Sequence, residues 1–148
     1  MNLDDFDQDL LEGFAQLLQA EGVGTYRPTA GYAVSETGIY LEGTPETANR
    51  VIQLTTYSVD EHPAYGSDVI GLQVITRWEN ANPFPCRRLD TQIFNRLQGR
   101  ASFTLPTGIR VETCSRRSGA SLGMDSSKRW GRSSNYYLRV HRPTLYRL

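Results

Sequence analysis

The chain has 148 residues, of which 39% are apolar, and its 16 basic and 16 acidic side chains leave no net charge. This length is typical of one domain of about 100–200 residues, so we expect a single domain over residues 1–148. No apolar run approaches the roughly 18–20 residues that span a bilayer. Residues 1–12 are acidic, unlike a secretory signal, so we expect synthesis in the cytoplasm and no membrane contact.

The sequence offers little metal or disulfide chemistry. The two cysteines, Cys86 and Cys114, lie far apart and form no CxxC motif. A zinc site usually draws on closely spaced ligands, and the neighbouring residues Asp60, Glu61 and His62 rarely point at one ion. We therefore expect two reduced thiols, no metal and no cofactor.

The charges are divided unevenly along the chain. Residues 1–79 hold 13 acidic and three basic side chains, a formal charge of −10, whereas residues 80–148 hold 13 basic and three acidic ones, a charge of +10. Two interpretations stay open. Opposite charges meet inside one fold, or the acidic surface of one subunit meets the basic surface of a neighbour.

The N-terminal segment has the pattern of an amphipathic helix. Asn2 or Asp4 can cap its start, and Gly22 can end it. Its apolar side chains recur at helical spacing, at Phe6, Leu10, Phe14 and Leu17. We expect this stripe to pack in the core.

Three strands are predicted next, after an extended loop over residues 25–36. Alternating apolar and polar side chains favour extended structure here. The segment Asp68–Trp78 is apolar on both faces, which indicates a central position in the sheet. The three predicted strands are Gly38–Glu42, Arg50–Val59 and Asp68–Trp78.

A second helix and three more strands complete the pattern. The helix is predicted over Asn82–Gly99, where prolines precede an apolar stripe. A hairpin with a three-residue turn joins Ser102–Leu105 to Ile109–Cys114, and Ser134–His141 forms the last strand. The order is α-β-β-β-α-β-β-β. Strands adjacent in sequence most simply pair antiparallel, so we predict an α+β fold with two helices packed on a mainly antiparallel sheet.

The segment Ser115–Ser133 is too long and too polar for a simple turn, and loops of this length are usually functional. Its cations would repel one another without a partner, so we expect a loop that is mobile when free and forms a protein interface. The candidate interface residues are Arg116, Arg117, Lys128, Arg129, Trp130 and Arg132.

Several stretches along nearly the whole chain resemble the phage minor capsid protein family, which is similar to siphophage tail terminators. The C-terminal part carries most of the resemblance, and shorter N-terminal and central stretches agree with it. The matching stretches are 117–125, 129–130, 134–143, 24–27, 37–40 and 69–74.

The resemblance implies a structural protein of a tailed-phage virion. Such a subunit would have a tail-terminator-like fold and form a ring, typically hexameric, at the tail end or neck. The ring would stop growth of the tail tube and join the tail to the head. Its partners would be copies of itself, the major tail tube protein and a head-completion or neck protein, and DNA would pass through without tight binding. Assembly would take place in the host cytoplasm. A head–tail adaptor is an alternative position in the virion.

Two other classes of function are weighed against this one. Residues 119–123 match the G-x-S-x-G elbow of hydrolases, with Asp125 and His141 following, but no buried strand leads into Ser121 and no helix pattern follows it. We therefore expect no enzymatic activity. An arginine-rich nucleic-acid-binding protein is the other alternative, because arginines lie near Trp130, Tyr136 and Tyr137. The neutral charge of the whole chain speaks against a dedicated binder.

Overall fold

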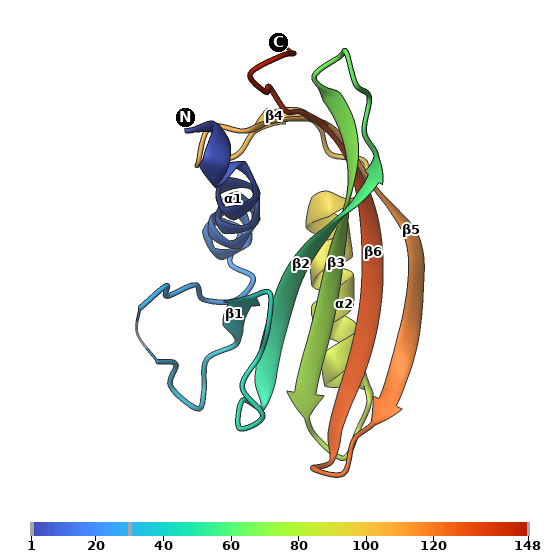
Figure 1. The fold of residues 1–148 in the computed structure, drawn as a ribbon. Helices are drawn as coiled ribbons and strands as arrows, with labels where there is room; N and C mark the ends of the chain where they lie inside the picture. Colours follow the sequence, from blue (N-terminus) through green and yellow to red (C-terminus); the bar gives the residue numbers. More distant parts are fainter. Residues whose placement is uncertain (1, 30, 148) are drawn as a thin grey trace.

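The computed structural model describes residues 2–29 and 31–147. Its six strands form one sheet in the order β1-β2-β3-β6-β5-β4 (Figure 1). As expected, the strand that is apolar on both faces, β3 (Ser67–Glu79), lies inside the sheet, between β2 (Arg50–Asp60) and β6 (Arg129–His141). The last strand of the sequence therefore occupies the middle of the sheet.

The predicted α+β class is confirmed, and the details differ from the prediction, because a single 3-10 turn precedes the first helix and one strand pair is parallel. The other elements are α1 (Phe6–Ala20), preceded by a single 3-10 turn, β1 (Gly38–Leu41), α2 (Phe84–Leu97), β4 (Ala101–Thr104) and β5 (Arg110–Met124). All neighbouring strands run antiparallel except β1 and β2, which are parallel.

The connection over residues 42–49 makes the parallel pair possible, because it returns the chain along β1 before β2 begins. Glu42 turns the chain with a left-handed φ of 69°. The carbonyls of the returning segment are held by Arg77, whose Nε donates to Ala48 at 3.0 Å and whose Nη2 donates to Pro45 at 2.8 Å. A short connection was expected to form a hairpin, but this one is fixed by side chains from distant strands.

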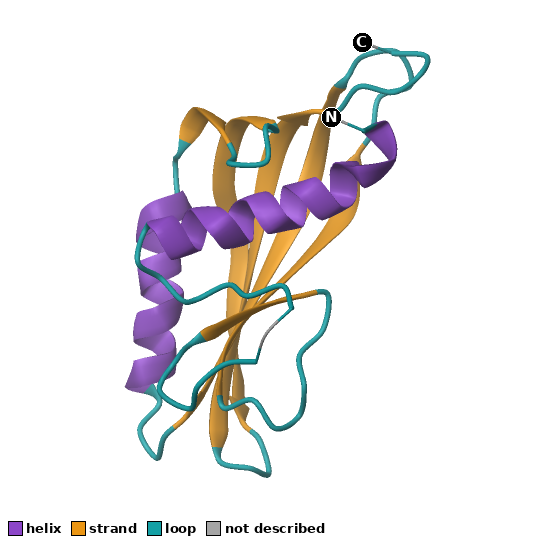
Figure 2. Ribbon diagram, turned by 90° about the vertical axis from the view of Figure 1, so that its left-hand side faces the viewer, coloured by secondary structure: helices purple, strands orange, loops and turns teal. Residues whose placement is uncertain are grey.

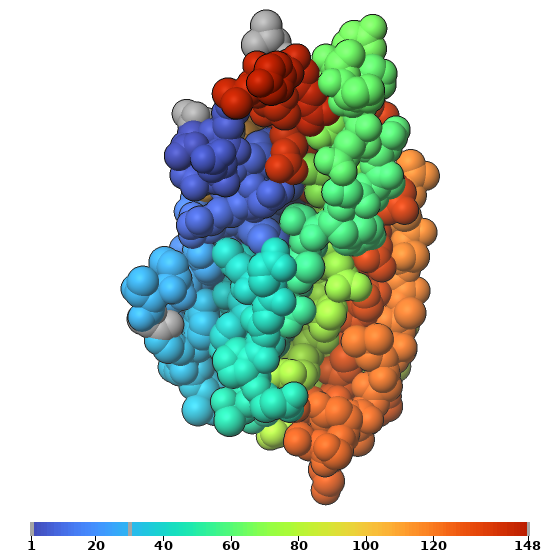
Figure 3. All heavy atoms as spheres, in the orientation of Figure 1, coloured from blue at the N-terminus to red at the C-terminus, as the bar shows by residue number. Residues whose placement is uncertain are grey.

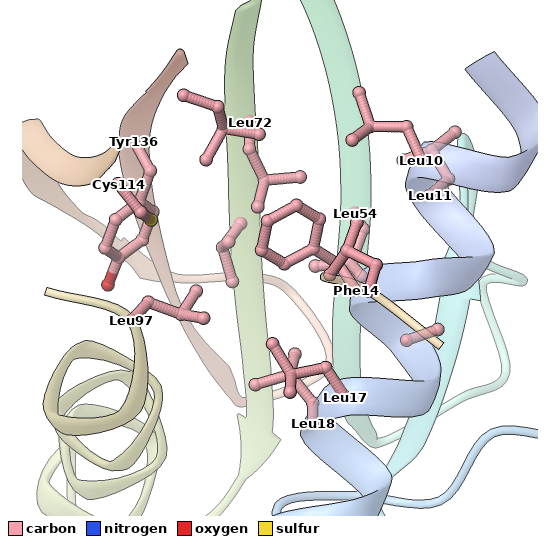
Figure 4. Close-up of a cluster of buried hydrophobic side chains, with 14 of the residues drawn as sticks. Leu10, Leu11, Phe14, Leu17, Leu18, Leu54, Leu72, Leu97, Cys114 and Tyr136 are labelled. Carbon is pink, nitrogen blue, oxygen red and sulfur yellow. The ribbon is translucent and has the colours of Figure 1, made fainter. Parts of the chain in front are cut away.

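Both helices lie on the same face of the sheet (Figure 2). α1 contacts β1 and β2, and α2 contacts β3, β6 and β5. Figure 4 shows the resulting core, where Phe14 and Leu18 of α1 face Leu54 and Leu72 of the sheet. Within the described residues, neither helix covers the opposite sheet face, whose side chains are mostly polar.

The helix and hairpin signals of the sequence are confirmed. Asn2 accepts a hydrogen bond from the Asp4 backbone N–H at the N-terminal 3-10 turn. In the hairpin between β4 and β5, Gly108 adopts a left-handed φ of 99°.

Both cysteines are buried and reduced, and burial raises the pKa of Cys114 to about 12. No helix among the described residues is long and apolar enough to cross a membrane.

We expect Gly13→Ala to lower the free energy of unfolding by up to about 2 kcal/mol. Alanine gains roughly 1 kcal/mol of helix propensity over glycine, but its Cβ would lie 2.6 Å from Thr107 Oγ1 and 2.9 Å from Leu105 Cβ. Overpacking of this kind costs about 1–3 kcal/mol. Urea unfolding measures the difference, and Gln16→Ala, at a half-buried position of the same helix, is the control. A Gly13→Ala protein more stable than wild type would contradict the close packing.

Candidate functional site

The predicted loop over Ser115–Ser133 is a β-ribbon, and the expectation of an irregular loop is wrong. β5 continues to Met124, β6 begins at Arg129, and only a short turn joins them. β6 is paired with β5 on one side and with β3 on the other, where Arg129 lies opposite Glu79. This part of the chain is therefore built into the sheet.

Arg129, predicted to lie at an interface, is an internal residue, only 4% exposed. Its Nε donates to Asp125 Oδ2 at 2.8 Å, and its Nη1 donates to the carbonyls of Glu46 and Ala48. The backbone N–H and the guanidinium of Arg129 hold the pKa of Asp125 below its usual value. Arg129 therefore joins the β5–β6 turn to the segment that precedes β2.

Arg116 and Arg132 are also engaged within the fold, around the buried Asp90 of α2. Asp90 accepts hydrogen bonds from Ser134 Oγ at 2.7 Å and from Arg132 Nε at 3.2 Å. Arg116 lies 3.6 Å from the same carboxylate and places its guanidinium 4.3 Å from the Phe94 ring centroid. A buried carboxylate needs such partners, so these cations hold α2 on the sheet.

Arg117, Lys128 and Trp130 remain available at the surface to different degrees. Arg117 is exposed and lies 5.4 Å from the Tyr137 ring centroid, on the sheet face without helices. Lys128 is exposed in the β5–β6 turn. Trp130 is half-buried beside Phe84, and its Nε1 has no hydrogen-bond partner among the described residues.

The charge division is partly neutralised inside the fold. Among the described residues, four ion pairs join an acid of the first half to an arginine of the second. The first interpretation of the charge pattern therefore holds for these residues. The four pairs are Glu21–Arg100, Glu46–Arg129, Asp7–Arg142 and Asp68–Arg147.

The sheet has two free edges that the sequence did not reveal. β1 pairs with residues 51–54 of β2, so residues 55–60 pair only with β3 among the described strands. β4 pairs with residues 110–113 of β5, so residues 117–124 pair only with β6. The free edges lie at opposite margins and toward opposite ends of the sheet (Figure 1). Unpaired edges are ready sites for pairing with another chain.

The geometry gives little support to a hydrolase elbow, a metal site or a nucleic-acid stacking surface. Ser121 lies within an edge strand, where its Oγ accepts from the Gly123 backbone N–H at 3.1 Å, and not at a strand-to-helix elbow. The described residues contain no group of three metal-ligating side chains. For nucleic-acid stacking, Tyr136 is fully buried and Trp130 is half-buried.

Comparison with known proteins finds a likeness among solved structures. No protein-family model matches the chain, and no curated protein does. Among solved structures, a chain from the virion of a native gene transfer agent particle is similar, with a TM-score of 0.58 and 13% sequence identity. The match covers 70% of this chain and 78% of that chain. At this identity, the likeness shows that the two chains share a fold.

We expect Arg129→Ala to lower the free energy of unfolding by about 1–3 kcal/mol, because the carbonyl of Glu46 loses its donor, the carbonyl of Ala48 keeps only Arg77, and Asp125 loses its guanidinium partner. Lys128→Ala is the matched control, since this neighbouring cation is exposed and should change stability by no more than about 0.5 kcal/mol. Thermal and urea unfolding measure both. Equal stabilities of the two variants would contradict the internal role of Arg129.

Proposed function

We propose that the chain is a structural subunit of a tailed-phage virion, of the tail-terminator or minor capsid type, which forms a ring at the tail end or neck. The observation that carries the proposal is the fold shared with a chain from a gene transfer agent virion, over most of both chains. The sequence resemblance to phage minor capsid proteins points to the same class.

The two free edges support ring formation. β2, β3, β6 and β5 alternate in direction across the sheet, so the free edge of β5 runs antiparallel to the free edge of β2. Because the two free edges lie toward opposite ends of the sheet, two subunits with the same orientation would be shifted along the strands for these edges to pair as neighbouring antiparallel strands, and the strands would then be tilted to the ring axis. A contact between two different surfaces repeats from subunit to subunit and closes into a ring when the rotation fits. We expect a hexamer.

The same surfaces suit either position in the virion. A tail terminator would contact the major tail tube protein on one side and a head-completion or neck protein on the other, and a head–tail adaptor would use comparable faces. DNA would pass through the ring without tight binding. Dedicated nucleic-acid binding is disfavoured because Arg116, Arg129 and Arg132 are engaged with carboxylates.

We expect Ala120→Lys to abolish ring formation while leaving the melting temperature almost unchanged. Ala120 is exposed on the free edge of β5, and lysine on an edge blocks strand pairing between chains. Ala33→Lys is the matched control, because Ala33 is equally exposed but lies in the loop before β1. Native mass spectrometry and negative-stain imaging of purified protein and of particles measure the outcome. Wild-type protein that is never found in a ring, in solution or in particles, would contradict the proposal.

The proposed role includes no catalysis. We expect no labelling of Ser121 by a fluorophosphonate probe, because no base of the described residues is hydrogen-bonded to its hydroxyl and the residue lies on an edge strand. The Ser121→Ala variant is the control for labelling elsewhere. Stoichiometric labelling that is lost in Ser121→Ala would establish a nucleophile and overturn the purely structural role.

A further inference from the structure

Exposed apolar side chains gather at the two ends of the sheet. At the end that holds both termini, Leu145 is 82% exposed and Tyr146 is 94% exposed. At the opposite end, Phe84 is 65% exposed and Leu122 is 58% exposed. In Figure 3 the C-terminal residues (red) and the β2–β3 connection (green) form the upper end, and the β5–β6 turn (orange) forms the lower end. Exposed apolar groups gathered in this way are typical of interaction sites.

The upper apolar group is a rigidly held turn. Arg147 donates from Nη1 and Nη2 to the fully buried Asp68, at 2.7 and 2.5 Å, and Nη1 also donates to the carbonyls of His62 and Tyr65. The Thr144 backbone N–H donates to the Arg147 carbonyl at 2.9 Å. Leu145 and Tyr146 lie between these two fixed residues. Because the turn is already ordered, binding through it would cost little conformational entropy.

The lower end offers a receptor for such a turn. An open groove of about 620 Å³ lies along the first turns of α2, lined by Phe84 and Pro85 together with Arg87 and Arg88. This groove is shallow and open to solvent, so it offers an apolar surface on which exposed side chains can pack and does not enclose them. A smaller pocket between Phe84 and Trp130 continues the apolar surface toward β6.

The charges of the two ends are complementary. The exposed side chains of Asp4, Asp5, Asp60 and Glu61 lie at the upper end, and none of them forms an ion pair with another described residue. At the lower end the exposed cations Arg87, Arg88 and Lys128 are likewise without an ion-pair partner among the described residues. These side chains give the two ends mainly opposite charges, with Glu79 at the lower end and Arg139 toward the upper end carrying the other sign.

We propose that a second copy of this chain docks end to end, with the Leu145–Tyr146 turn of one copy in the α2 groove of the next. Acids beside the turn would then meet Arg87 and Arg88, where carboxylates find bidentate donors. The contact joins two different surfaces, so it would stack free copies along the strand direction and leave the free sheet edges available. In a particle, the tail tube and neck proteins would take the place of the next copy at the two ends. The inference rests on the proposed structural role and adds a second, axial contact to the lateral one.

The experiment uses the Ala120→Lys protein as background, so that lateral pairing is blocked and only the end-to-end contact remains. Two further double variants each remove one end, Leu145→Ser with Tyr146→Ser and Arg87→Glu with Arg88→Glu. The background protein should self-associate, and each double variant should be monomeric with an unchanged melting temperature, because the altered residues are exposed. When the two variants are mixed in equal amounts, the intact turn of the Arg87→Glu, Arg88→Glu protein should bind the intact groove of the Leu145→Ser, Tyr146→Ser protein. The resulting heterodimer has no further intact end and should not grow. Native mass spectrometry and sedimentation measure the assemblies.

Val34→Ser is the control, because Val34 is 94% exposed but lies in the loop before β1; it should associate as the background does. A background protein that stays monomeric at the highest soluble concentration would overturn the end-to-end contact, as would a mixture that remains monomeric or a turn variant that still dimerises alone. Each of these results would leave ring formation by the Ala33→Lys protein unaffected, so failure of the axial contact is distinct from failure of the proposed function.

Discussion

The pairing of β6 on both sides is the constraint on which the rest of the structure depends. This strand forms the last part of the sheet in sequence, yet it lies between β3 and β5 and joins the two halves of the chain. Without it, β4 and β5 would have no connection to β1, β2 and β3 within the sheet. The free edge of β5 and the position of the β5–β6 turn follow directly from this placement.

The regular elements could be predicted from the sequence because their side-chain patterns are local. The stripe that includes Phe6, Leu10 and Phe14 gives a helix whatever its partner is. The apolar side chains on both faces of β3 favour a place between two other strands, which predicts its position inside the sheet. The parallel pairing of β1 with β2 was not predictable in this way, because it depends on Arg77 holding carbonyls of a segment about thirty positions away in sequence.

The candidate site was predicted less well, for two physical reasons. The ribbon consists largely of glycine, serine and alanine, and register shifts after Arg116 and Ser121 interrupt its alternation, so the period of a strand is hidden. In addition, the sequence does not indicate which carboxylate a given arginine will pair with, because the partner lies far away along the chain. Arg129 and Arg132 find partners on other elements, Glu46 and Asp90, and so the arginines that looked most available are among the least exposed.

The central place of β6 also has a consequence for synthesis. During translation β3 leaves the ribosome well before β6. Until β6 follows, the edge of β3 that later pairs with β6 has no partner. β3 carries apolar side chains on both faces, and an unpaired apolar edge readily associates with other chains. When several copies are made near one another, premature association between chains would begin at the unpaired edge of nascent β3. The exposure ends when the backbone of β6 pairs along that edge.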